Sequence, residues 1–152
     1  MAAKTAKKTA DGFTAEERAA MKERAAELRA EGKKGAKKAD MLQAVLDRIA
    51  EMAPEDRVVA ERVHATVTAT APELSPKTWY GMPAYANADG KVVVYFQDAG
   101  KFRSRYSTLG FNDDAALDDG DMWPVSFAIA GWSPQTEEMV TNLVTAATST
   151  QP

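Results

Sequence analysis

Residues 91–97 (KVVVYFQ) and 101–109 (KFRSRYSTL) decide the fold class of this chain. The first run is apolar on both of its faces, which predicts a central strand covered on both sides. The second run alternates between the two faces of a strand, with Arg103 and Arg105 on the same face. Turn signals at 88–90 (ADG) and 98–100 (DAG) precede the two runs and predict hairpins. We therefore expect neighbouring strands to be antiparallel.

Two further regions extend this sheet. Residues 77–82 (KTWYGM) and 84–87 read as strands on either side of Pro83. Because proline cannot donate to a sheet ladder, Pro83 predicts an edge or a bulge. Alternating apolar residues at 125–129 predict a last strand. The expected sheet has about four to five strands.

Helical signals flank the strands on both sides. A capping box of Thr14 and Glu17 starts a helix to about residue 31, whose thin apolar stripe predicts weak packing. Asp40 and Gln43 suggest a second capping box, Pro54 begins a helix that runs to about residue 70, and Ser133-Pro134 begins a closing helix. Helices followed by neighbouring strands predict an α+β fold, an antiparallel sheet with helices packed on it.

The charge is divided unevenly along the 152 residues. Residues 1–38 carry 11 Lys and Arg against 6 Asp and Glu, whereas residues 39–152 carry 8 against 16. We expect a basic arm over 1–38, with a disordered start, a helix at about 14–31 and a flexible linker. An α+β domain follows over 39–148, and residues 149–152 form a disordered tail.

Several function classes are excluded by composition. The chain has no Cys and a single His, so cysteine chemistry and two-His zinc motifs cannot occur within it. No nucleophile elbow, P-loop or dinucleotide fingerprint is present. The sequence therefore predicts a non-enzymatic protein without catalytic residues. No apolar run is long enough for a membrane span, so we expect a cytoplasmic location without membrane association. No oligomeric state follows from the sequence.

Residues 75–86 (SPKTWYGMPAYA), together with 91–97, 101–109 and 116–124 (ALDDGDMWP), resemble the YdhG-like family of small bacterial proteins with a domain of unknown function. The tetrapeptide at 80–83 (YGMP) is the most specific part, and the resemblance covers about residues 40–147. It implies an α+β fold with helices against an antiparallel sheet. Some members are described as frataxin-like iron chaperones, so the resemblance also implies weak iron binding through oxygen ligands.

Two groups of residues offer sites for these functions. The acidic loop provides oxygen ligands for a hard cation such as ferrous iron, at Asp113, Asp114, Asp118, Asp119 and Asp121. A block rich in aromatic residues could instead be the core of a small sheet or line a pocket for a small molecule or peptide. The residues predicted to bind such a ligand are Trp79, Tyr80, Met82, Tyr85, Phe102, Arg103, Arg105 and Trp123. Arg103 and Arg105 could grip a carboxylate or phosphate, or pair with the acidic loop.

Two functions thus compete, and the basic arm adds a third. The first is an iron chaperone with carboxylate ligands, and the second is a non-enzymatic binding module that uses the aromatic block. Nucleic acid is expected to associate only with the arm, through its lysines. His64 is predicted to lie at the edge of its helix, outside any site.

Overall fold

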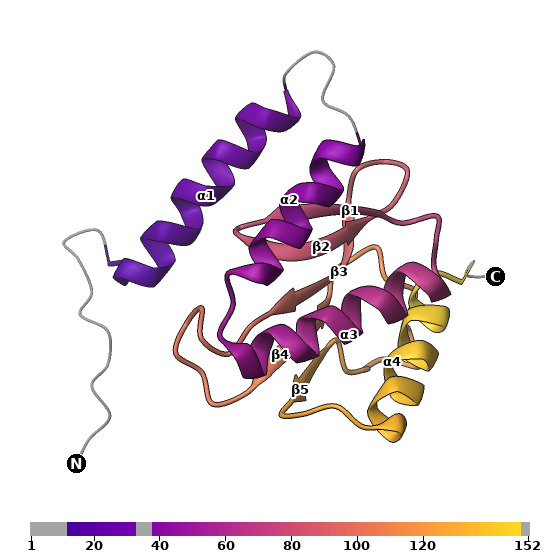
Figure 1. The fold of residues 1–152 in the computed structure, drawn as a ribbon. Helices are drawn as coiled ribbons and strands as arrows, with labels where there is room; N and C mark the ends of the chain where they lie inside the picture. Colours follow the sequence, from indigo (N-terminus) through magenta and orange to yellow (C-terminus); the bar gives the residue numbers. More distant parts are fainter. Residues whose placement is uncertain (1–11, 33–37, 150–152) are drawn as a thin grey trace.

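The computed structural model describes residues 12–32 and 38–149, and within them it contains four helices and a five-stranded antiparallel sheet (Figure 1). The predicted α+β class is confirmed. The disordered start, most of the linker and most of the tail fall on residues outside the described ones.

The helices begin close to where the sequence predicts. Thr14 and Glu17 form the expected capping box of the first helix, and Ser133 accepts from the amide of Thr136 as N-cap of the last. The second helix begins two residues before Asp40, which therefore lies in its first turn and does not cap it. The four helices are α1 (Ala15–Glu31), α2 (Lys38–Ala50), α3 (Pro54–Thr70) and α4 (Pro134–Ala147).

The five strands pair in the order of the chain, β1-β2-β3-β4-β5, and each neighbouring pair is antiparallel. The strands are β1 (Ser75–Trp79), β2 (Met82–Ala86), β3 (Val92–Gln97), β4 (Ser107–Phe111) and β5 (Ser126–Ile129). This order explains why short turns are sufficient to connect the first three strands.

Three strand predictions are wrong in detail, two of them around Pro83 and the third at 101–109, where the strand begins only at Ser107. Residues 77–82 do not form one strand, because Tyr80 and Gly81 make the turn between β1 and β2. Pro83 lies in β2, which is not an edge strand, although the β2–β3 register does shift between Tyr85 and Ala86, as at a β-bulge. The β2–β3 register begins only at Ala84, so the missing amide of Pro83 falls beyond the end of that ladder.

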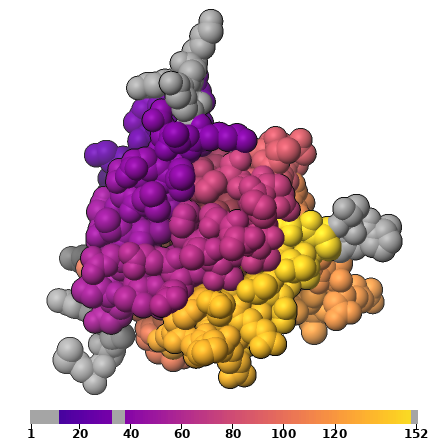
Figure 2. All heavy atoms as spheres, turned by 45° about the vertical axis from the view of Figure 1, so that its right-hand side comes forward, coloured from indigo at the N-terminus to yellow at the C-terminus, as the bar shows by residue number. Residues whose placement is uncertain are grey.

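The hydrophobic core lies on one side of the sheet, beneath α2, α3 and α4. The strand register places Tyr85, Val94, Phe96 and Leu109 on this side. The helices contribute fully buried valines to the same cluster, at positions 45, 63, 67 and 144. Figure 2 shows the three helices, in purple, magenta and yellow, covering this face. We call this side of the sheet the core side.

The opposite side of the sheet carries Lys77, Trp79 and Tyr95, and α1 packs against it near β1. In Figure 1, α1 stands apart from the pair α3 and α4. The only residue of α1 that is buried is Ala20, which confirms the weak apolar packing that its thin stripe predicts. We call this the α1 side.

Candidate functional site

A cavity of about 320 Å³ lies between α1 and the aromatic residues of the α1 side. The wall opposite the sheet consists of Phe13, which precedes α1, and of Glu17, Ala20 and Met21 in α1. The wall on the sheet consists mainly of large side chains from β1, β2, β3 and their connections. These are Trp79, Tyr80, Met82, Tyr95, Gln97 and Phe102. We call this space the aromatic cavity.

Ring packing fixes the sheet wall of the aromatic cavity. The Trp79 ring meets the Tyr80 ring edge to face at a centroid distance of 5.0 Å, and its centroid is 5.2 Å from that of Tyr95. Tyr95 also lies over Gly110 of the paired strand, where an added Cβ would overlap its ring. Glycine at position 110 therefore allows Tyr95 to lie close to the sheet.

The β1–β2 turn borders the cavity and is held by side chains from two helices. Tyr80 and Gly81 have φ values of 53° and 75°, which suit a two-residue hairpin turn. Their amides donate to the two oxygens of Glu27 in α1, each at 2.8 Å. From the other direction, Nε of Arg48 in α2 donates to the Gly81 carbonyl at 2.7 Å, and its guanidinium also pairs with Asp98.

Three ion pairs connect α1 to the sheet and its loops. The Glu31 carboxylate lies 2.9 Å from the Lys77 ammonium, and the Glu23 carboxylate lies 2.8 Å from that of Lys101. Glu16 pairs with the exposed Arg103 at 3.1 Å. These contacts join residues 46 to 87 positions apart in the chain, so no local sequence pattern predicts them. The four-residue spacing of Glu23, Glu27 and Glu31 was the available signal, because it places them on one helix face.

Four of the eight residues predicted to bind a ligand line the aromatic cavity: Trp79, Tyr80, Met82 and Phe102. Trp123 is half-buried and does not line it. The two arginines are not gathered there either. Residues 101–106 form turns and bends before β4, so the expected shared strand face of Arg103 and Arg105 is wrong. Arg103 pairs with Glu16, and the Arg105 guanidinium lies over the Tyr106 ring.

Tyr85 lies on the core side, away from the aromatic cavity. It is 1% exposed, and its hydroxyl shares a hydrogen bond of 2.8 Å with Nδ1 of His64. Burial raises the pKa of the Tyr85 hydroxyl and lowers the pKa of the His64 imidazole, since both charged forms are poorly solvated there. The sequence prediction placed His64 at its helix edge and missed this hydrogen bond, which joins residues 21 positions apart.

The acidic loop does not gather its carboxylates. Asp113, Asp118, Asp119 and Asp121 are exposed, whereas Asp114 accepts a hydrogen bond from Asn87 at 2.7 Å. Over residues 12–32 and 38–149, no group of three or more His, Asp or Glu side chains is placed to hold a metal ion. These residues therefore do not fit a preformed iron site, and weak iron binding stays a prediction.

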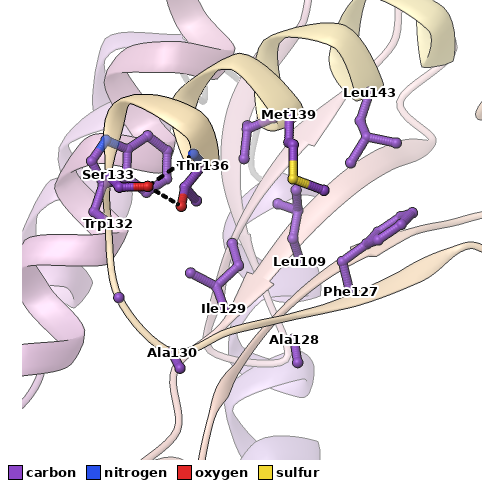
Figure 3. Close-up of a pocket in the computed structure, with 12 residues that line it drawn as sticks. Leu109, Phe127, Ala128, Ile129, Ala130, Trp132, Ser133, Thr136, Met139 and Leu143 are labelled. Atoms are coloured by element: carbon purple, nitrogen blue, oxygen red, sulfur yellow. Dashed lines mark hydrogen bonds between the residues drawn. The ribbon is translucent and has the colours of Figure 1, made fainter.

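A second cavity of about 420 Å³ lies between β5 and α4 (Figure 3). Leu109, Phe127 and Ile129 project into it from the sheet, and Met139 and Leu143 from α4. Its two hydroxyl groups, Ser133 and Thr136, bond to each other at the start of α4 and so satisfy each other.

The comparisons with known proteins identify no relative. No family model matches the chain, and neither the curated proteins nor the solved structures contain a significant match. The YdhG-like resemblance therefore stays a prediction from the quoted motifs. No helix in the described part of the chain is long and apolar enough to cross a membrane. Apart from Lys38 at the start of α2, the lysines predicted to contact nucleic acid lie outside the described residues.

Proposed function

We propose that this protein is a non-enzymatic binding module that takes a small, largely apolar molecule into the aromatic cavity. The observation that carries the proposal is the cavity itself, which joins Trp79, Tyr80, Met82 and Phe102 on one side of the sheet. Its volume of about 320 Å³ lies within the range of small-molecule sites, at the lower end.

The lining favours a ligand with a flat apolar body and one or two polar groups. Trp79 and Tyr95 offer ring surfaces for stacking. The side chains of Tyr80, Tyr95 and Gln97 make no hydrogen bond within the described residues, and each can donate to or accept from a ligand. Few polar groups in an apolar lining are typical of sites that orient a small ligand.

The cavity between β5 and α4 is a weaker candidate despite its larger volume. Its hydroxyl groups already serve the N-terminus of α4, so they offer less to a ligand. Iron delivery is also weaker, because the acidic loop keeps its carboxylates apart. The aromatic cavity therefore supports the better-founded function.

A titration with 1-anilinonaphthalene-8-sulfonate, an apolar fluorescent anion, tests the proposal. We expect saturable one-site binding to the full chain. Met21→Glu places a carboxylate at the rim of the aromatic cavity and should weaken binding at least about tenfold, a loss of ~1.4 kcal/mol. Both Met21 and Met139 are exposed, so Met139→Glu is a matched control at the other cavity and should leave the affinity unchanged.

Three outcomes would contradict the proposal. The dye could fail to saturate, Met139→Glu could reduce binding while Met21→Glu does not, or both variants could bind like the wild type. Far-UV circular dichroism of each variant establishes that the comparison is made between folded proteins.

A further inference from the structure

A row of glutamates on α1 meets a matching row of donors on the rest of the chain. Glu23, Glu27 and Glu31 follow one another at four-residue spacing and so share one helix face. Facing them in the same order are Lys101, the β1–β2 turn and Lys77. Each glutamate of the row therefore meets a donor outside α1, and Arg24 of α1 itself also pairs with Glu31 at 3.1 Å and lies 3.5 Å from Glu27.

The centre of this row is a carboxylate held by backbone amides. Both oxygens of Glu27 accept from consecutive amides, those of Tyr80 and Gly81, and its side chain is largely buried. Charge-assisted bonds of this kind recognise an anion, and here the Arg24 guanidinium of the same helix adds a longer contact of 3.5 Å to one of the oxygens. The two-residue hairpin, with φ of 53° at Tyr80 and 75° at Gly81, is what directs both amides to the same carboxylate.

The lysines on either side of the turn, Lys77 and Lys101, also require an anionic partner. Only 8% of the Lys77 side chain and 7% of the Lys101 side chain are exposed, although each carries a charge. Buried ammonium groups require an anionic partner, because desolvation without one is costly. Within the described residues, that partner is a glutamate of α1 in both cases.

The helix that supplies these glutamates is otherwise weakly attached. Met21 and Leu28 remain 39% and 54% exposed, and Ala20 is the single buried residue of α1. The glutamates of its two lysine pairs, Glu31 and Glu23, remain 27% and 40% exposed, so these pairs weaken as salt rises. An acidic helix with the same spacing and better apolar contacts would therefore compete with α1 for the same donors.

We infer that Lys77, Lys101 and the Tyr80-Gly81 amides form a receptor for an acidic helix of a partner protein, which α1 occupies within the chain. The partner helix carries glutamates four residues apart. Charge complementarity and the carboxylate already seated on the turn define its chemistry. This inference goes beyond ligand binding in the aromatic cavity and does not depend on it.

A labelled peptide provides the test, with the sequence of residues 12–32 (GFTAEERAAMKERAAELRAEG). The receptor is the full chain with Glu23→Gln, Glu27→Gln and Glu31→Gln, whose own α1 has lost its charged row. Fluorescence anisotropy at low salt should show saturable binding to this variant. Binding to the wild type should be at least about tenfold weaker, because α1 occupies the receptor there.

Two matched controls make the result specific. A peptide with the same three Glu→Gln changes should not bind, and adding Lys77→Gln and Lys101→Gln to the receptor variant should abolish binding of the original peptide. Absence of binding to a folded receptor variant would overturn the inference, as would equal binding of both peptides. If circular dichroism shows that the triple variant is unfolded, Glu27→Gln alone serves as the receptor under the same expectations.

Discussion

The two sides of the sheet hold their helices by different forces. On the core side, α2, α3 and α4 bury valines completely against Phe96 and Leu109. On the α1 side, a single helix is held by ion pairs and by a carboxylate on the β1–β2 turn, while Met21 and Leu28 remain 39% and 54% exposed. The same sheet therefore supports an apolar core on one side and a charged contact on the other.

This difference shows which helices are essential to the fold. Apolar burial stabilises in proportion to area and without directional requirements, so the core side supplies most of the stability. Charged contacts depend on position and on salt, so they determine where α1 lies more than whether the chain folds. The following predictions test this division of roles.

The largest effect is expected on the core side. Phe96 is fully buried, so Phe96→Ala removes a ring and leaves a cavity, which should lower the free energy of unfolding by about 3–5 kcal/mol. Urea denaturation followed by far-UV circular dichroism measures this change.

Met21→Ala is the matched truncation on the α1 side. Because Met21 is well exposed, its loss should lie within ~0.5 kcal/mol, as for most surface substitutions. Similar losses for the two truncations would show that α1 is held by apolar packing after all, and the comparison between the two sides would fail.

An intermediate effect is expected at the β1–β2 turn, where Gly81 has a matched control in Gly90 of the β2–β3 turn. Gly81 and Gly90 both have a left-handed φ, of 75° and 80°, so alanine at either should cost about 1–2 kcal/mol in backbone strain. Only at position 81 would the new Cβ also overlap the carboxylate of Glu23, which pairs with Lys101. Gly81→Ala should therefore loosen α1 as well.

Amide hydrogen exchange distinguishes the two glycine variants. We expect protection of the α1 amides to fall about tenfold in Gly81→Ala, equivalent to ~1.4 kcal/mol, while Gly90→Ala leaves it unchanged. Equal exchange from α1 in both variants would mean that the contact between Gly81 and Glu23 does not position the helix.

The core side was predictable from the sequence because its signals are local and periodic. The apolar run around Val94 and Phe96 identifies a central strand, and the helix at Pro54–Thr70 has the predicted bounds. The turns at 88–90 and 98–100 were predicted from their residue types and lie between antiparallel strands, although the second one opens a connection that runs to residue 106.

The α1 side was less predictable because it depends on contacts between distant residues. The hydrogen bond between the Tyr80 amide and Glu27 joins residues 53 positions apart, and neither residue type alone predicts it. The residue types did not predict the turn at Tyr80-Gly81, because tyrosine rarely adopts the left-handed φ of 53° that this turn requires. Of the predicted ligand-binding residues, those near this turn line one cavity, whereas Tyr85 follows the strand alternation to the core side.

The smallest effect is expected from pH, and it arises on the core side. Burial lowers the pKa of His64 below its ordinary value of 6.5, so the unfolded chain takes up a proton more readily than the folded one. Stability should be complete above about pH 6.5 and should fall as the pH drops below it, until the folded protein is protonated as well. Tyr85 stays protonated throughout, since its pKa is raised, and the change comes from the imidazole.

Urea midpoints at pH 7.5 and 5.5 for the wild type and His64→Gln measure the effect, because glutamine keeps hydrogen-bonding groups without titrating. The wild type should lose more stability than the variant, and an equal loss would place the pH dependence in the carboxylates and leave His64 without a part in it.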